Sequence, residues 1–345
     1  MPDVAPIEEI DPGQASETVL RELHRLTEGG RADLFPHRPP APWPAYLRRV
    51  RLPAGGSRER HWVARREHGA VGLAELEILE LGQQHPFAEA MLIVDPAWRR
   101  RGVGSELLEA VVRVAPGEAA PVLSVAAVLD SPGASFLDDR GLACKSVERL
   151  GVLDLATVDI GKLGGWVAAA PALAKGYSLV QWSDACPDDL LERFARLRDV
   201  MNTAPLDDSQ FDPMHWTPER VRTREAAIGE RGDQSWTLVA RHDASGGLAG
   251  FTRLRLAADR PGLASQGDTG VDPAHRGRRL GRWLKAAMVL RLRAERPDVT
   301  CIETGNAASN APMLAINDAM GFRTVTRIGL WQADTATLTA RLEDQ

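Results

Sequence analysis

An internal repeat constrains this chain of 345 residues more than any other feature. The sequence VDPAWR at 94–99 returns as VDPAHR at 271–276, an offset of 177 residues (271 minus 94). Three further matches keep nearly this offset: VAR at 63–65 and 239–241, Gly72 and Gly250, and Gly141 and Gly321. Ordered matches with small drift predict two copies of one domain, whereas a solenoid would show a much shorter period.

The repeat places the domain boundary near the middle of the chain. We expect an N-terminal domain over 1–160 and a C-terminal domain over 177–345. The segment 161–176 is expected to be a linker, because it is rich in Gly and Ala, contains Pro171 and lacks clear periodicity. Two copies in one chain form a pseudo-dimer, so both a monomer and a homodimer are compatible with the sequence.

Each copy has the same order of expected elements. A helical region is followed by two strand-like runs with a glycine turn, and by a third strand that leads into the DPA sequence. An arginine- and glycine-rich turn then starts a helix with periodic apolar residues, and a strand follows. A short helix stops at Gly141 or Gly321, and a strand pair closes the copy. Strands mixed with helices in this order predict an α/β or α+β fold around a mixed sheet.

Composition excludes several classes of function. The chain is 44% hydrophobic and 26% charged, which is typical of a globular protein. Its net charge of -5 argues against nucleic-acid binding, and no apolar run is long enough to cross a membrane. Three dispersed cysteines and eight histidines without a metal-binding spacing predict neither disulfides nor a metal site. With no signal-peptide pattern at its start, we expect a soluble cytoplasmic protein.

The chemistry is expected at the two strand–turn–helix segments. Glycines let the backbone turn tightly, and the first amides of the helix point outward with the positive end of the helix dipole behind them. Such a turn binds phosphate or pyrophosphate, and arginines add charge-assisted contacts. The sequence fits neither a Walker A loop nor the dinucleotide fingerprint. The residues concerned are Arg99, Arg100, Arg101, Gly102, Val103 and Gly104 in the first half, and Arg276, Gly277, Arg278, Arg279, Leu280 and Gly281 in the second.

The turn, the V-x-P strand end before it and the downstream Asn310 and Gly321-Phe322 resemble the GNAT superfamily of acyl-CoA-dependent N-acyltransferases. The resemblance covers most of both halves, and the tandem layout is similar to that of bacterial two-domain members such as the mycothiol synthases. It implies that each turn holds the pyrophosphate of acetyl-CoA. It also implies that the strand ending at Val94 or Val271 pairs with the pantetheine arm and polarises the thioester carbonyl. Asn310 stands where the family has an asparagine that helps to hold CoA; an N-cap role is the alternative.

The two halves depart from the family pattern in different ways. Arg279 replaces the first motif glycine in the second half. In the first half Asp130 replaces the asparagine and Leu142 replaces the Phe of GF, and an anionic Asp130 near CoA is unfavourable. We therefore expect a degenerate first half and a catalytic second half. The family's frequent tyrosine acid is missing, with Asn317 at its position in the second half, so the use of a general acid stays open.

Acyl transfer to an amine also needs a base, because an ammonium group must lose a proton before it attacks. Asp268, on the strand before the second turn, is one candidate; a solvated turn residue is the alternative interpretation. Glu303, on the next strand, is the other candidate in this half. Glu89 lies near the corresponding place in the first half and keeps that half in consideration.

The expected function is acetyl transfer from acetyl-CoA to a primary amine of a small molecule. Direct attack in a ternary complex is expected, because no activated cysteine or serine is evident for an acyl-enzyme. Two alternatives stay open at this point. One is a non-catalytic CoA-binding or regulatory protein, and the other is a peptide or protein N-acetyltransferase, because substrate loops vary independently of the cofactor turn.

Overall fold

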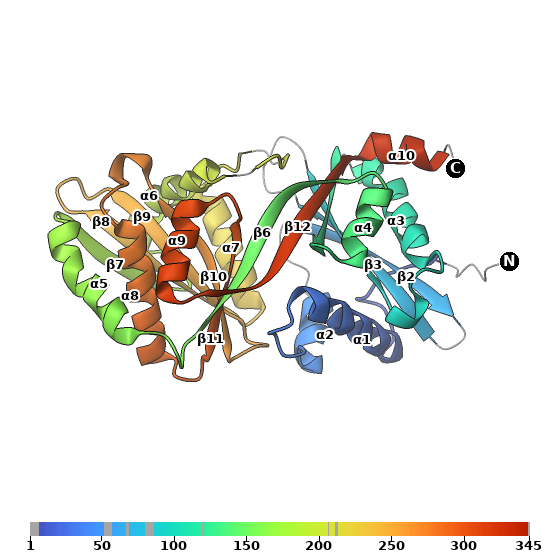
Figure 1. Cartoon of the computed structure of the whole chain (residues 1–345), viewed down its shortest axis with the longest axis horizontal. Coiled ribbons are helices and arrows are strands. Elements are labelled where there is room, and N and C mark those ends of the chain that lie inside the picture. The colour runs from blue at the N-terminus through green and yellow to red at the C-terminus, as the bar shows by residue number, and fades with distance from the viewer. Residues whose placement is uncertain are drawn as a thin grey trace. The chain divides into compact units, whose positions relative to one another are not determined.

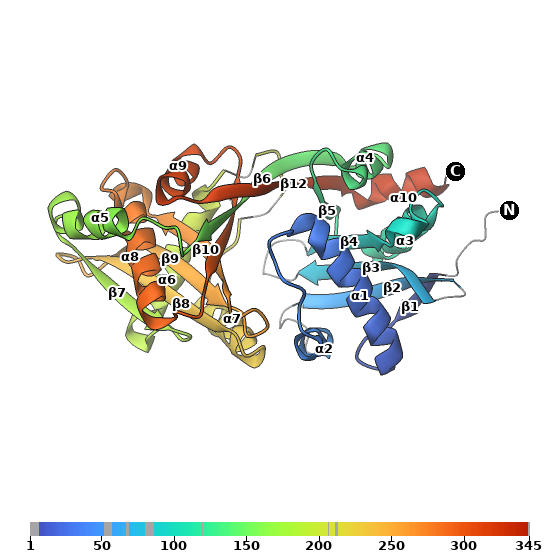
Figure 2. The same ribbon diagram turned by 60° about the horizontal axis from the view of Figure 1, so that its bottom comes forward.

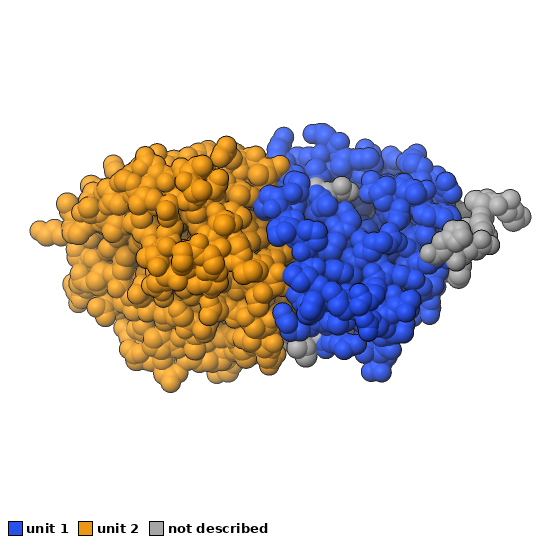
Figure 3. All heavy atoms as spheres, turned by 90° about the horizontal axis from the view of Figure 1, so that it is seen from below, with its two compact units in different colours: residues 1–148, 206–213, 326–345 blue, residues 149–205, 214–325 orange. Residues whose placement is uncertain are grey.

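The computed structural model describes residues 7–51, 57–66, 69–79, 86–118, 120–205, 207–210 and 213–343 (Figure 1). The chain divides into two compact units, coloured separately in Figure 3. Unit 1 comprises residues 1–148, 206–213 and 326–345, and unit 2 comprises residues 149–205 and 214–325. The predicted mixed α/β fold is confirmed in both units.

Unit 1 is a mixed sheet with helices on both faces. Helix α3 covers one face together with α4 and α10, and α1 and α2 cover the other (Figure 2). The strand order is β1-β2-β3-β4-β5-β12-β6, with β4 and β5 parallel. Its elements are β1 (Ile7–Ile10), α1 (Glu17–Leu34), α2 (Trp43–Arg51), β2 (Ser57–Arg66), β3 (Gly69–Leu79), β4 (Phe87–Val94), α3 (Val103–Val114), β5 (Val122–Val128), α4 (Pro132–Asp139), the start of β6 (Ala143–Asp154), the end of β12 (Arg323–Asp334) and α10 (Thr335–Glu343).

Unit 2 repeats this plan. Helix α8 covers one sheet face with α5 and α9, and α6 and α7 cover the other. The strand order is β6-β11-β10-β9-β8-β7, with β10 and β11 parallel. Besides the end of β6 and the start of β12, its elements are α5 (Ile160–Leu173), β7 (Tyr177–Ser183), α6 (Asp188–Arg198), α7 (Pro218–Glu230), β8 (Gln234–His242), β9 (Leu248–Leu256), β10 (Leu263–Val271), α8 (Leu280–Glu295), β11 (Cys301–Ala307) and α9 (Ala311–Met320).

The two sequence copies exchange their last strands between the units. The end of β12 belongs to unit 1, where it pairs with β5 from Ile328–Val128 to Asp334–Val122. The Trp331 indole N–H donates to Asp138 at 2.8 Å within the same unit. The end of β6 belongs to unit 2, where β6 is the neighbour of β11. The compact units are therefore not two continuous stretches of sequence.

Residues 161–176, expected as a linker, lie mostly in helix α5. Asp159 caps the start of this helix by accepting a hydrogen bond from the Lys162 backbone N–H at 2.8 Å. The Leu163 side chain is buried in the same hydrophobic cluster as helix α8. Leu163, Ala170 and Ala174 of this segment thus pack in the hydrophobic core of unit 2.

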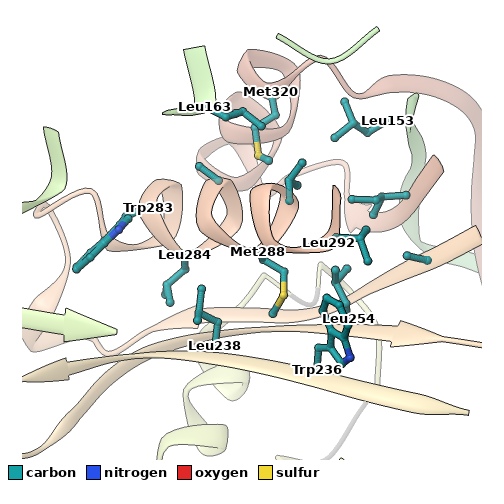
Figure 4. Packing of buried hydrophobic residues seen from close by; sticks show 14 of the residues in the cluster. Leu153, Leu163, Trp236, Leu238, Leu254, Trp283, Leu284, Met288, Leu292 and Met320 are labelled. Carbon is teal, nitrogen blue, oxygen red and sulfur yellow. The ribbon is translucent and has the colours of Figure 1, made fainter. Parts of the chain in front are cut away.

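The core of unit 2 fixes the helix that follows the second turn. Leu284, Met288 and Leu292 recur every four residues on α8, and all three are fully buried (Figure 4). Burial of each such side chain contributes about 1.5–3 kcal/mol. Opposite them, Leu238 and Leu254 on neighbouring strands belong to the same cluster. The packing of α8 in the core therefore fixes the position of its first turn and of the arginine–glycine turn before it.

Candidate active site

The two arginine–glycine turns have the same local structure in the two units. In each, an aspartate caps a short 3₁₀ helix: Asp95 accepts from the Ala97 N–H at 3.1 Å, and Asp272 from the Ala274 N–H at 2.8 Å. The first arginine of each turn then reaches back to the strand. The Arg99 Nε donates to the Val94 carbonyl at 3.2 Å.

In the second turn the Arg276 Nε donates to the Val271 carbonyl at 3.0 Å, and its Nη2 donates to the Thr203 hydroxyl at 2.6 Å. Arg276 therefore holds the turn against the strand end, whatever else it contacts. The same reasoning applies to Arg99 in the first turn. These two side chains were expected as ligands of the cofactor, and the structure gives them a positioning role that sequence reasoning missed.

Both turns use left-handed backbone at the same two positions, with glycine and arginine exchanged. In the first turn Arg100 has φ 62° and Gly102 has φ 90°. In the second turn Gly277 has φ 79° and Arg279 has φ 60°. Arg279 therefore preserves the shape of the turn although it replaces the motif glycine. A non-glycine residue in this conformation costs roughly 1–2 kcal/mol.

The start of α8 presents unpaired amides beside exposed guanidinium groups. The first helical hydrogen bond is donated by the Trp283 N–H to the Arg279 carbonyl at 3.1 Å, so the N–H groups of the preceding residues 280–282 lack intrahelical partners. Arg278 and Arg279 are exposed, and the helix dipole adds positive charge at this end. These donors fit a pyrophosphate, which would be held by the backbone of the turn and its arginines.

The parallel strands next to each turn pair over only part of their length. In unit 2 the β10–β11 register runs from Leu263–Cys301 to Gln266–Thr304. The rest of β10, up to Val271, pairs with β9 alone in the described register. The backbone groups of 267–271 on the β11 side are thus available to a ligand, next to the turn. In unit 1 the β4–β5 pairing is similarly short, from Ala88–Leu123 to Ala90–Val125.

A β-bulge distinguishes the second half from the first. The β10–β9 register shifts between Gln266 and Thr269, so Gly267 and Asp268 together oppose Arg253. In unit 1 the β4–β3 register runs without a shift from Phe87–Leu79 to Val94–Gly72. Bulges turn backbone groups out of the ladder and are over-represented beside active sites. In the described registers, unit 2 has a bulge where its parallel strands separate, and unit 1 has none at the equivalent place.

Glu303 and Ser265 face each other at the last part of the parallel pairing. They are register partners, and the Ser265 hydroxyl donates to Glu303 Oε1 at 2.8 Å. Their neighbours Ile302 and Ala264 belong to the α8 core, so these two side chains point to the opposite sheet face, toward α6 and α7. Glu303 is 5% exposed.

The first half has the same pair with the two side chains exchanged between strands. Glu89 on β4 is the register partner of Ser124 on β5. By strand register Glu89 corresponds to Ser265, an offset of 176 residues (265 minus 89), and Ser124 corresponds to Glu303, an offset of 179 (303 minus 124). The sequence carries this signal. An alignment of the two copies strand by strand pairs Glu89 with Ser265 and Ser124 with Glu303.

The Glu89 carboxyl lies in an acidic environment. Its side chain is exposed, but desolvation by neighbouring protein atoms raises its pKa, and the like charges of Glu77 and Glu148 raise it further. Glu77 is its direct partner across the β3–β4 ladder. In the described part of unit 1 these three carboxylates converge where unit 2 has a single glutamate and arginines.

Asp268 is engaged by an arginine. The Arg198 Nη2 on α6 donates to Asp268 Oδ2 at 2.9 Å, and the Arg198 side chain is 5% exposed against 37% for Asp268. Arg198 also stacks over the Trp216 ring. Burial, followed by the nearby Arg253 charge, lowers the pKa of Arg198 to about 9, although the Asp268 carboxylate opposes this shift.

Asn310 caps helix α9. Its side-chain oxygen accepts from the Met313 N–H at 3.3 Å, which is the N-cap role left open by the sequence. Asn317, at the position of the family's tyrosine, is buried and donates to Asn306 at 2.6 Å. Within the described ranges, no group of three or more His, Cys, Asp or Glu side chains is placed to hold a metal ion. Among the same residues no helix is both long and apolar enough to cross a membrane.

The chain is similar to known acetyltransferases in sequence and in structure. The family model described as acetyltransferase (GNAT) domain matches residues 57–136, in the first half. A mycothiol acetyltransferase of Clavibacter sepedonicus is 34% identical over 239 residues, covering 68% of this chain and 69% of the relative. A mycothiol acetyltransferase of Saccharomonospora viridis is 26% identical over 332 residues, covering 92% of this chain and 94% of that protein.

Among solved structures, a tandem GNAT protein from the clavulanic acid biosynthesis pathway has a TM-score of 0.76 and 26% identity. It covers 96% of this chain and 99% of its own. A GCN5-related N-acetyltransferase from Sphaerobacter thermophilus shares the fold, with a TM-score of 0.67, 18% identity and 97% coverage of both chains. With the family match, these relatives and the structural match to a tandem GNAT protein, the chain belongs to the GNAT family as a tandem, acetyl-CoA-dependent N-acetyltransferase.

Proposed function

We propose that the second half acetylates the primary amine of a small molecule, while the first half has mainly a structural or cofactor-binding role. The observation that carries this assignment is the β-bulge at Gly267 and Asp268, which unit 1 lacks in its described register. It coincides with the separation of β10 from β11 and with the buried Glu303–Ser265 pair. These features place backbone donors and a carboxylate at one point of the sheet.

Acetyl-CoA supplies the activated acetyl thioester of the reaction. The amides of 280–282 and the exposed Arg278 and Arg279 would hold its pyrophosphate, as the donor set of the turn indicates. The N–H groups of 267–271 that face away from β9 would stabilise negative charge that develops on a carbonyl oxygen. Both groups are backbone donors fixed by the fold, so they need no rearrangement during the reaction.

Glu303 is the proposed base. The acceptor arrives as an ammonium ion, and a positioned carboxylate that takes its proton makes the amine nucleophilic. Asp268 is less suited, because its carboxylate is already held by the Arg198 guanidinium in an ion pair at 2.9 Å. Ser265 orients the Glu303 carboxyl through its hydrogen bond. The amine then attacks the thioester carbonyl directly in a ternary complex, without an acyl-enzyme; the C–N bond forms, the C–S bond breaks and the thiolate of CoA leaves.

Matched variants test this assignment. Initial rates of CoA release are measured with a panel of primary amines for the wild type, Glu303→Gln and Glu89→Gln, which stand at exchanged positions of the two halves. Loss of general-base catalysis predicts a fall in kcat of about 100-fold or more for Glu303→Gln. Glu89→Gln is expected to keep the wild-type rate. The opposite ranking would move the reaction to the first half.

A first-half site is the second candidate, and two observations favour it. The first turn keeps the motif glycine, Gly102, and the family model matches residues 57–136. Its carboxylates, Glu77, Glu89 and Glu148, would then accept the proton and attract a cationic amine. The same two variants discriminate between the halves, because each removes the base of one half only.

A further inference from the structure

Two arginines converge on the bulge from different elements. Arg253 on β9 lies directly opposite Gly267 and Asp268 in the ladder. Arg198 on α6 contacts the bulge through its hydrogen bond to Asp268. Leu254 packs in the α8 core, so the adjacent Arg253 points to the same sheet face as Glu303. The two guanidinium groups thus lie at the sheet face that carries Glu303, the proposed base.

Each of the two guanidinium groups has an N–H group without a hydrogen-bond acceptor in the described residues. The Nε atoms of Arg198 and Arg253 are buried without a hydrogen-bond acceptor in the described residues. Arg253 donates to the Ser235 hydroxyl at 3.1 Å, and no carboxylate of the described chain lies within ion-pair distance of it. A buried cation is unfavourable unless it is paired and hydrogen-bonded. Burial lowers the pKa of Arg253, as it does for Arg198.

The carboxylates near the two arginines already have polar partners of their own. Asp268 serves Arg198, and Glu303 is bonded by Ser265. Glu225 on α7 forms an ion pair with Arg222 at 2.7 Å. Asp233 forms an ion pair with Arg255. The fold therefore keeps two arginines at the bulge with one carboxylate directly paired to them.

We propose, building on the proposed function of the second half, that the acceptor amine carries an anionic group, a carboxylate or a phosphate, which Arg198 and Arg253 bind. Guanidinium groups bind such oxyanions through paired N–H donors. The anion would supply the missing acceptors for the two Nε atoms or their neighbouring N–H groups. Its amine would then face Glu303 on the same sheet face.

Matched amine pairs test the inference. β-Alanine is compared with β-alaninamide, and O-phosphoethanolamine with ethanolamine, by kcat/KM from CoA release. Charge-assisted bonds predict a preference for an anionic member of about 10- to 100-fold in the wild type. Arg253→Gln should remove this preference, mainly through KM. The pair with the larger preference identifies the anion as carboxylate or phosphate.

Arg196→Gln is the control, because Arg196 lies on the same helix as Arg198 but is 65% exposed and pairs with Glu192. It should keep the preference of the wild type. Neutral amines that the wild type acetylates as well as anionic ones would overturn the inference and leave the proposed function intact.

A binding measurement separates the two claims if no amine is acetylated, an outcome that would refute the proposed function. Succinate and inorganic phosphate are added to the wild type and to Arg253→Gln at constant ionic strength, and the Tm is recorded. A ligand that binds the folded state raises the Tm. A rise in the wild type that Arg253→Gln lacks supports the anion site, and equal curves for both proteins overturn it.

Discussion

Lys285 is a buried cation in the helix that carries the second turn. It is 1% exposed on α8, and its ammonium lies 5.2 Å from the Phe322 ring. No ion pair involves it in the described part of the chain, and burial lowers its pKa to about 7. At the equivalent position of the first half, the repeat offset gives Leu108, which is also buried. The perturbation is therefore Lys285→Leu.

The expected effect depends on pH with a definite sign. The pKa is lowered in the folded state, so between about pH 7 and 10.5 the unfolded chain binds a proton that the folded chain does not. The wild-type stability therefore rises with pH in this window, by about 1.4 kcal/mol per pH unit from this group. The free energy of unfolding of Lys285→Leu minus that of the wild type should fall by about 2.5 kcal/mol from pH 7.5 to 9.5.

Urea unfolding of both proteins at a series of pH values measures this difference. Lys175→Gln, a change at an exposed lysine, is the control and should follow the wild-type curve. A constant difference between Lys285→Leu and the wild type over this pH range would refute the reasoning. It would mean that Lys285 keeps its proton in the folded protein.

The turns and strands allow further tests of stability. Arg279→Gly should raise the free energy of unfolding by about 0.5–1 kcal/mol, because glycine adopts φ 60° without strain but gains entropy when unfolded; unchanged urea unfolding would contradict the strain. Gly270→Ala should lower it by about 1–3 kcal/mol, because the new Cβ would lie 2.5 Å from Val200 Cγ1. Gly229→Ala on helix α7, where nothing lies within 4 Å, is its control and should stabilise by up to about 1 kcal/mol. If Gly270→Ala leaves the free energy of unfolding unchanged, the Val200 side chain can move away from the new Cβ.

The repeat and the turns were predictable because they depend on local sequence. Segments that differ at one residue, such as 94–99 and 271–276, fold alike, and the capping by Asp95 and Asp272 follows from short-range hydrogen bonds. The fold class followed from the order of these elements, and the family from the resemblance of the turn, the V-x-P strand end, Asn310 and Gly321-Phe322 to the GNAT pattern. The sequence allowed two roles for Asn310, a contact with CoA and an N-cap, and the structure shows that its side chain caps α9.

The strand exchange and the bulge were not predictable from the sequence. Both copies carry a closing strand, and nothing local in Ile328–Asp334 determines that it pairs with β5 of the other copy. The bulge depends on one extra residue at Gly267 and Asp268 relative to β9, which periodicity does not resolve. Arg253 was missed for the same reason, because its importance comes from lying opposite that bulge.

Titration of acetyl-CoA into matched charge-reversal variants tests the central claim most directly. Arg278 and Arg101 occupy equivalent exposed positions of the two turns, and neither bonds to the strand end as Arg276 and Arg99 do. Isothermal titration and the rate of amine acetylation are measured on the same samples. We predict that Arg278→Glu weakens acetyl-CoA binding about tenfold or more and suppresses transfer, while Arg101→Glu retains transfer. Unchanged binding and transfer in Arg278→Glu, with both lost in Arg101→Glu, would contradict a catalytic second half.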